Sequence, residues 1–249
     1  MSGHSRWANI KHKKAKSDAK RGKLWSKCVR AVMAGARQGG GDPATNLTLR
    51  YAIDEAKAAN VPKDTIEKAI AKATGAAEGQ NFEAVTYEGY GPGGVAIFVE
   101  ALTDNRNRTA GDVRTYFGKH GGNLGASNSV AYQFQPRGVF AVSKETVEEE
   151  KLMEVALDAG AEDVTDEGEV WQIVTEVAKF MQVRQALEQA GIKPEHAELT
   201  RIADNTITLG AEDAKKVLAL IEALEDLDDV QKVHANYDIP DEVMAAMEG

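Results

Sequence analysis

The sequence lacks several features that define large classes of protein. Its 249 residues include one cysteine, Cys28, so no disulfide can form within the chain. No apolar run approaches the roughly 20 residues that a membrane-spanning helix needs, and the longest candidate, Val95–Val99, stops at Glu100. The basic beginning of the chain is not followed by the apolar stretch of a secretory signal. We therefore expect a cytoplasmic protein that has no membrane partner.

Sequence patterns of catalysis and metal binding are also missing. The G-x-S-x-G, H-E-x-x-H, C-x-x-C and Walker patterns do not occur. The five histidines show no metal-ligand spacing to Cys28 or to one another. We therefore expect no enzyme, no cofactor, no metal site and no small-molecule substrate.

One glycine pattern resembles a nucleotide-binding motif. Gly89, Gly91 and Gly94 fit G-x-G-x-x-G, which in dinucleotide-binding proteins lies directly before a helix. Here the glycines precede Val95–Val99, whose composition is typical of a strand, and Pro92 removes one backbone N–H from the loop. The pattern therefore predicts a glycine-rich connection between two strands.

Positive charge is concentrated at the start of the chain. Residues 1–37 contain eleven Lys or Arg and one acid, Asp18, which gives this segment a net charge of +10. The whole chain carries −9, so residues 38–249 carry −19. Such segregation indicates that one end of the protein meets a polyanion while the rest stays away from it.

The spacing of these charges predicts a basic stripe on a helix. Ser17–Gln38 contains no proline, and at about 100° per residue six of the cations between positions 16 and 37 fall within roughly a third of the helix circumference, opposite the apolar residues. The predicted stripe consists of Lys16, Lys20, Lys23, Lys27, Arg30 and Arg37. Because like charges four residues apart repel, contact with a polyanion is favoured over an ordinary solvated face, which remains the alternative.

The residues before this helix have the composition of a basic arm. On nucleic acid its cations would contact phosphates, and its one aromatic side chain would stack on a base. The predicted contact residues of the arm are Arg6, Trp7, Lys11, Lys13 and Lys14. The alternative for Trp7 is that it packs against the helices.

A second basic patch is predicted at Arg106 and Arg108. They lie within Thr103–Thr109, a segment rich in residues that cap helix N-termini, and such N-termini attract anions. The patch is a candidate phosphate contact. The alternative is a capped helix with solvated arginines.

The residue pattern predicts an α+β protein. Three short amphipathic helices come first, and the second of them starts at Asp42-Pro43. The pattern then changes to a strand, a glycine connection, a second strand, a helix, and a third strand at Ser129–Gln135. Residues 138–203 have the order βαββαβ, the ferredoxin-like split βαβ. The strand, helix and strand that follow could complete the half domain left open at Gln135, which would make residues 138–203 an insertion.

Four segments of the chain together suggest a family: Met1–Lys13, Asn60-Val61-Pro62, Tyr87–Ala96 and Thr103–Thr109. They resemble the YebC/PmpR family, whose mitochondrial members are translational activators. The sequence departs from the family pattern at Ser127-Asn128-Ser129-Val130, where Gly-Ser-Val is expected, and this affects the expected backbone geometry there.

The resemblance implies a three-domain regulator that is not an enzyme. The expected domains are a basic arm with a helical bundle at 1–78, a discontinuous α+β domain at 79–136 plus 205–240, and an inserted ferredoxin-like domain at 137–204. Family members are usually described as probable transcriptional regulators that bind DNA. The alternative is a factor that binds ribosomal RNA and helps to translate difficult sequences such as proline runs. Oligomeric state and target sequence stay open.

Overall fold

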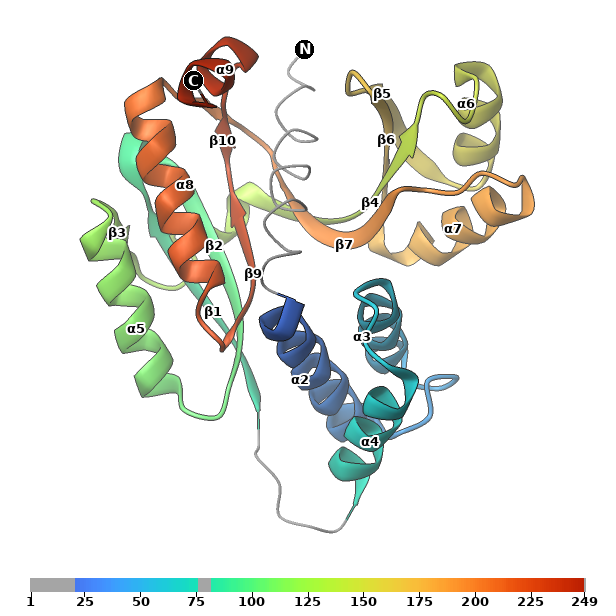
Figure 1. Cartoon of the computed structure of the whole chain (residues 1–249), viewed down its shortest axis with the longest axis horizontal. Helices are drawn as coiled ribbons and strands as arrows, with labels where there is room; N and C mark the ends of the chain where they lie inside the picture. The colour runs from blue at the N-terminus through green and yellow to red at the C-terminus, as the bar shows by residue number, and fades with distance from the viewer. Residues whose placement is uncertain (1–20, 76–81, 249) are drawn as a thin grey trace. The chain divides into compact units, whose positions relative to one another are not determined.

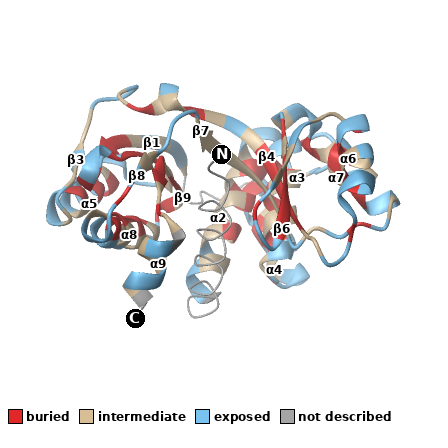
Figure 2. Ribbon diagram, turned by 90° about the horizontal axis from the view of Figure 1, so that it is seen from above, coloured by how far each residue is buried: buried red, intermediate tan, exposed pale blue. Residues whose placement is uncertain are grey.

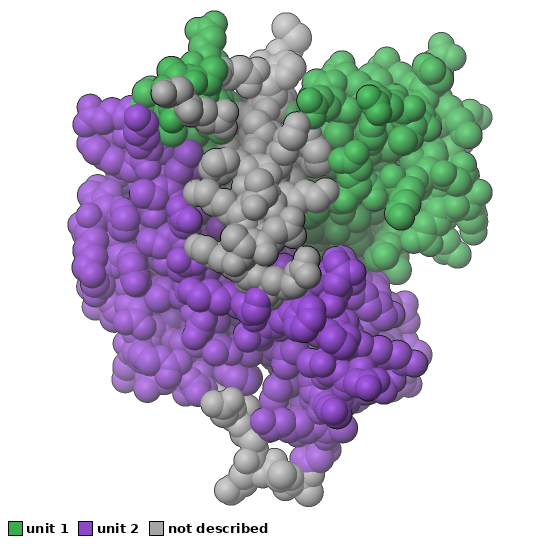
Figure 3. Space-filling view, viewed as in Figure 1, with its two compact units in different colours: residues 1–14, 132–211, 236–249 green, residues 15–131, 212–235 purple. Residues whose placement is uncertain are grey.

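The computed structural model describes residues 21–75 and 82–248, and among these residues the chain forms two compact units. One unit comprises the described residues up to 131 together with 212–235, and the other comprises 132–211 together with 236–248 (Figure 3). The helices of the described residues include none that is long and apolar enough to cross a membrane.

Three helices open the first unit, as the sequence predicts: α2 (Arg21–Gly39), α3 (Leu47–Ala58) and α4 (Lys63–Thr74). Their apolar faces form one buried cluster, to which α2 contributes Cys28, Val32, Met33 and Ala36. The indole N–H of Trp25 also donates to the carbonyl oxygen of Ala59 over 3.0 Å and so fastens α2 to the end of α3. The apolar face of α2 predicted from the sequence is confirmed.

The second helix begins later than predicted. Asp42 and Pro43 form a turn in which the Asp42 carboxylate accepts from the backbone N–H of Ala44, and α3 begins at Leu47. Its N-cap is Asn46, whose side-chain oxygen accepts from the N–H of Leu49 while its amide donates to two carbonyl oxygens of the preceding segment. Asn46 is 6% exposed. Asp42 and Asn46 are both residue types that cap helices well. Asn46 is the N-cap of α3 because its amide also satisfies buried carbonyl groups.

The first unit also contains a four-stranded sheet of order β3-β1-β2-β9. All of its neighbouring strands are antiparallel. Its strands are β1 (Glu83–Tyr90), β2 (Ala96–Thr103), β3 (Asn123–Leu124) and β9 (Val230–Ala235). Helices α5 (Arg106–Lys119) and α8 (Ala211–Glu225) lie on one face of it (Figures 1 and 2). The segment Pro92–Gly94 is a short 3-10 turn between β1 and β2, so the glycine pattern is a strand connection, as predicted.

The second unit contains a sheet of order β5-β6-β4-β7 in which all neighbouring strands are antiparallel. Its elements are β4 (Phe134–Ser143), α6 (Glu149–Asp158), β5 (Ala161–Asp166), β6 (Val170–Thr175), α7 (Phe180–Gln189) and β7 (His196–Ala203). This order is the predicted ferredoxin-like arrangement. The rings of Phe140 on β4 and Phe180 on α7 stack with centroids 4.6 Å apart. Over residues 21–75 and 82–248, three helices are therefore followed by two α+β regions.

The predicted strand at Ser129–Gln135 is wrong over most of its length. A 3-10 turn occupies Ala131–Gln133, and β4 begins at Phe134. The reason is the buried carboxylate of Glu88 on β1, which accepts the backbone N–H groups of Asn128, Val130 and Ala131 over 2.7 to 2.8 Å. Backbone donors that point at one carboxylate cannot also take part in a strand ladder.

The closing elements divide between the two units. Strand β9 pairs with β2 and completes the first sheet, with Val99 opposite Val233. The short strand β8 (Ile207–Thr208) instead pairs in parallel with β10 (Tyr237–Asp238) in the other unit. Helix α9 (Asp241–Glu248) follows. The pairing of β9 with β2 supports a discontinuous α+β domain, although the three domain boundaries given above stay a prediction.

Candidate nucleic-acid interface

The structure shows where part of the predicted basic stripe lies. Arg6, Trp7, Lys11, Lys13, Lys14, Lys16 and Lys20 are outside the described residues. Lys23, Lys27 and Arg30 lie on α2 at positions i, i+4 and i+7, on a different face from the buried residues Cys28 and Val32. The helix thus carries its apolar and basic residues on separate faces.

These three cations meet the carboxyl end of α8 and the turn that follows it. We call the residues Glu225, Asp226, Leu227, Asp228 and Asp229 the acidic turn. The Lys27 ammonium donates to the carbonyl oxygen of Glu225 over 2.5 Å, and Lys23 donates to that of Asp226 over 3.2 Å. The Arg30 guanidinium donates to the carbonyl oxygen of Asp228 over 2.6 Å. Carbonyl groups at a helix end have no partner within the helix and carry the negative end of its dipole, so cations satisfy them well.

Burial and charge act against each other at Lys27. Burial lowers the pKa of Lys27 below its ordinary value, and the nearby charges of Glu225, Asp226 and Asp228 offset only part of that shift. Since burial penalises a charged ammonium, the protein holds Lys27 in this place at a cost that the acidic turn reduces.

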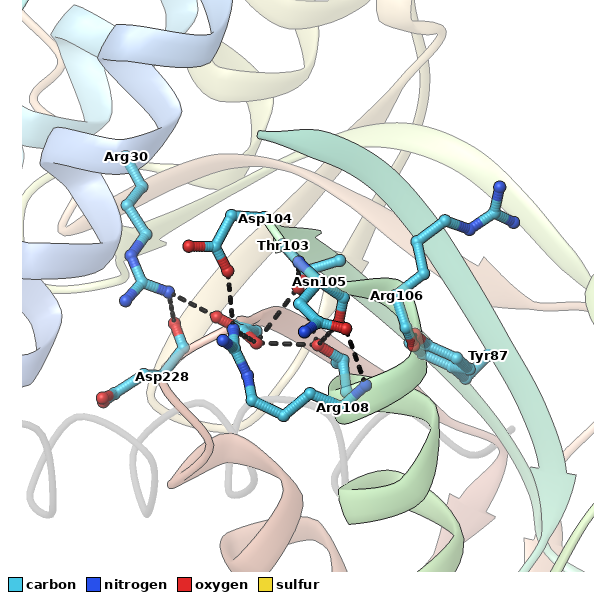
Figure 4. Close-up of polar contacts among 10 residues, drawn as sticks. Arg30, Tyr87, Thr103, Asp104, Asn105, Arg106, Arg108 and Asp228 are labelled. Carbon is cyan, nitrogen blue, oxygen red and sulfur yellow. Dashed lines mark hydrogen bonds and ion pairs between the residues drawn. The ribbon is translucent and has the colours of Figure 1, made fainter. Parts of the chain in front are cut away.

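Asp229 is the centre of a polar network at the end of the acidic turn, and its partners Arg30, Thr103 and Arg108 are labelled in Figure 4. Asp229 as a whole is 7% exposed to solvent. One carboxylate oxygen accepts from Arg30 over 2.8 Å. The other accepts from Arg108 over 2.6 Å and from the hydroxyl groups of Thr109 and Thr103 over 2.7 and 3.2 Å. One side chain therefore connects α2, the start of α5 and the end of β2.

The network fixes the ionisation of Asp229 and Arg108. Burial acts to raise the pKa of Asp229, but the hydrogen bonds from Arg108 and Thr109 and the charge of Arg108 outweigh it and hold the pKa below its usual range. The hydrogen bonds that Arg108 donates to Asp229 and Asp104 raise the pKa of Arg108. Asp229 is therefore a carboxylate, and Arg108 a cation, at neutral pH.

The two arginines of the predicted second patch differ in the contacts and the exposure of their side chains. Arg108 also donates to the carboxylate of Asp104 over 2.8 Å, so its guanidinium lies between two acids. The Arg106 side chain is 68% exposed, is 3.9 Å from Glu83, and points away from the network in Figure 4. The predicted helix start is confirmed, because Asn105 caps α5 by accepting the N–H of Arg108.

A pocket of about 520 Å³ adjoins the network. It is lined by Lys23, Arg30, Phe82, Asp104, Arg108, Thr109, Asp112, Asp226, Leu227, Asp228 and Asp229. Five aspartates against three cations give this lining a formal charge of −2, which disfavours a phosphate inside it. Cations of both predicted basic patches therefore line a pocket whose net charge is negative.

Sequence reasoning missed the acidic turn and its central residue, Asp229. The available signal was the run Glu225-Asp226-Leu227-Asp228-Asp229 directly after a predicted helix, four acids in five residues. Acids are unfavourable at a helix carboxyl end, so a run of them there indicates that cations from elsewhere offset their charge. A second link between the bundle and the sheet, Glu55 with Lys232 at 2.7 Å, left no such signal.

The departure from the family pattern at Asn128 is now explained. Asn128 has φ of +66°, in the left-handed region that glycine adopts most easily and that asparagine tolerates best among other residues. The backbone therefore keeps the conformation that glycine would adopt.

Comparisons with known proteins cover nearly the whole chain. Residues 5–76 match the family model described as "TACO1/YebC protein N-terminal domain", and residues 82–237 match "TACO1/YebC second and third domain". A relative from Rubrobacter xylanophilus named "Probable transcriptional regulatory protein" is 55% identical over 250 residues, which is all of both chains. One from Acidithiobacillus ferrooxidans with the same name is 53% identical over 248 residues, which is all of this chain and 99% of that one.

A solved structure gives the same result for the fold. The crystal structure of a conserved hypothetical protein from Aquifex aeolicus is similar with a TM-score of 0.82 and 49% identity, over 92% of this chain and 95% of that one. Together with the helical bundle and the two α+β regions, these matches show that the chain belongs to the TACO1/YebC family, and the two relatives above carry the name of probable transcriptional regulatory proteins.

Proposed function

We propose that this protein regulates gene expression by binding duplex DNA through its basic N-terminal segment. The observation that carries the proposal is the separation of charge, with +10 in residues 1–37 and −19 in the remainder. Phosphate contacts by lysine and arginine supply most of the affinity for nucleic acid, while the acidic remainder limits contact to one end. The names of the relatives support a regulatory role.

The contacts are proposed to come from two sets of side chains. The arm supplies Arg6, Lys11, Lys13 and Lys14 with Trp7 as a stacking residue, and the stripe supplies Lys16, Lys20, Lys23, Lys27 and Arg30. Arg106 and Arg108 form a weaker second contact, in which the more exposed Arg106 does more. Catalysis has no part in this function.

The test is a salt series on labelled duplex DNA with a matched control. Lys11, Lys13, Lys14 and Lys16 are changed together to Gln, and the control changes the exposed lysines Lys68, Lys72, Lys193 and Lys215 to Gln. Both variants lose four charges. Loss of four phosphate contacts lowers affinity by roughly 100-fold or more at moderate salt and flattens the salt dependence, whereas the control changes affinity a few-fold. Equal loss in both variants contradicts the proposal.

A second candidate function is docking on ribosomal RNA during translation. It is favoured by the composition of the α2 stripe, where lysine and arginine can contact a backbone but few Asn or Gln side chains are present to read base edges. Structured RNA is recognised largely by shape. Competition separates the candidates: purified ribosomes and unrelated duplex are each added to the complex with labelled DNA. Displacement by ribosomes at far lower concentration favours the second candidate, and survival of a particular duplex favours the first.

A further inference from the structure

The acidic turn occupies the cations that the proposed function needs. Lys23, Lys27 and Arg30 are three of the stripe residues, and each donates to an oxygen of the acidic turn. The acceptors lie within five consecutive residues: Lys23 donates to Asp226, Lys27 to Glu225, and Arg30 to Asp228 and Asp229. The turn therefore offers the stripe backbone carbonyl oxygens and the Asp229 carboxylate, together with the nearby negative charges of Glu225, Asp226 and Asp228.

Part of the contact is exposed, although Lys27 is half-buried and the Arg30 side chain is 24% exposed. The side chains of Lys23 and Asp226 are 49% and 40% exposed, and Lys23 lies 3.8 Å from the nearer carboxylate oxygen. Exposed ion pairs of this kind contribute little to stability and weaken with salt. In contrast, the apolar face of α2 is buried in the helical bundle and does not depend on the turn.

We propose that the acidic turn is an autoinhibitory contact that competes with nucleic acid for Lys23, Lys27 and Arg30. This inference rests on the proposed function. While the turn is in place, the three cations meet its oxygens; when nucleic acid binds them, phosphates replace those oxygens and the turn separates from α2. The apparent affinity is then the intrinsic affinity multiplied by the fraction of molecules in which the contact is open. As a direct consequence, the protein binds nucleic acid more weakly than the charge of the stripe alone would predict.

Asp229 must remain intact in the test, because it also holds Arg108, Thr103 and Thr109. The variant therefore combines Glu225→Gln, Asp226→Asn and Asp228→Asn, which removes the three negative charges facing Lys27. Its matched control combines Glu148→Gln, Glu149→Gln and Glu150→Gln, three exposed acids at the start of α6 in the other unit. The two variants have the same net charge, so a difference between them reports the local contact.

The first measurement requires no nucleic acid. Lysine modification by reductive methylation, followed by mass spectrometry, compares Lys23 and Lys27 with the exposed Lys68 and Lys72. The turn variant is expected to raise the modification rate of Lys27 relative to Lys68 by roughly tenfold, since each nearby negative charge that is lost changes the equilibrium by a few-fold. The control variant is expected to leave this ratio unchanged.

The second measurement is affinity for duplex DNA and for ribosomes at near-physiological salt. We expect the turn variant to bind roughly tenfold more tightly than the control variant, by the same opening equilibrium. If both variants bind equally tightly, or if the rate ratio of Lys27 does not change, the inference is overturned while the proposed function stands. If neither variant nor the unchanged protein binds either partner, the proposed function fails and the inference fails with it.

Discussion

The two four-stranded sheets of this protein gather their strands in different ways. The β5-β6-β4-β7 sheet takes all its strands from one continuous stretch, 134–203, whereas the β3-β1-β2-β9 sheet takes three from 83–124 and its fourth from 230–235. The buried charge network around Asp229 lies directly before that fourth strand. The β3-β1-β2-β9 sheet therefore takes a strand from a distant part of the chain, and specific polar contacts fix the chain where that strand, β9, begins.

The charged pair Lys144–Asp166 in the β5-β6-β4-β7 sheet is more exposed to solvent than the Asp229 network. Lys144 pairs with Asp166, and their side chains are 26% and 59% exposed. Asp229 has a side chain that is 10% exposed and is bonded by two arginines. Exposed pairs contribute about 1 kcal/mol or less, while removal of one partner from a buried network leaves the others without compensation. Variants at the two sites therefore test whether this difference in the structure is a difference in energy.

The largest expected effect is that of Asp229→Ala. It leaves Arg30, Arg108 and Thr109 without their shared acceptor, and we expect the free energy of unfolding of the first unit to fall by about 3 kcal/mol. The fluorescence of Trp25 reports that unit and that of Trp171 the other, so each is followed in a chain in which the other tryptophans are changed to Phe. Asp166→Ala should cost the second unit less than about 1 kcal/mol. Similar losses at both sites would show that burial of Asp229 does not matter.

A slightly smaller effect is expected for Glu88→Gln. The carboxylate accepts three backbone N–H groups, and an amide in its place directs its own N–H groups at one or more of them. We expect a loss of about 2 kcal/mol, since hydrogen bonds to a charged group are worth about 1.5–3 kcal/mol each and some survive. Hydrogen exchange of the amides of Asn128, Val130 and Ala131 should accelerate. Glu83→Gln on the same strand, whose side chain is 60% exposed, is the control and should have no measurable effect.

The dependence of stability on pH sharpens the comparison further. The pKa of Asp229 is held below its usual range in the folded protein, so its ionised form contributes stability that is fully present above the unfolded pKa and is lost as pH falls through the folded pKa. The difference in unfolding free energy between the unchanged protein and Asp229→Asn should be constant from neutral pH down to about pH 5, then shrink on further acidification. A difference that grows in acid would contradict the assignment.

Much of the fold follows from local patterns in the sequence. The apolar face of α2, the βαββαβ order and the glycine connection after β1 all depend on residues close together in the chain. The partners of the stripe could not be predicted in the same way, because Lys27 and Glu225 are 198 positions apart and no local pattern relates them. The same holds for Glu88, whose acceptors serve N–H groups about 40 positions later and turn a predicted strand into a loop. The sequence therefore predicts which residues form a basic face. It does not predict which distant residues of the same chain contact that face.

The smallest expected effect concerns Asn128, in the loop that Glu88 holds. Its φ of +66° is strained for most side chains, and glycine relieves that strain. Glycine also gives the unfolded chain more freedom, which offsets part of the gain, so Asn128→Gly should raise the free energy of unfolding by about 0.5 kcal/mol. The control is Asn107→Gly on the exposed side of α5, where glycine should instead lower it by roughly 0.3 kcal/mol. Denaturant titration of both variants gives the sign. A loss at both positions would mean that the asparagine side chain, and not its backbone conformation, determines stability in this loop.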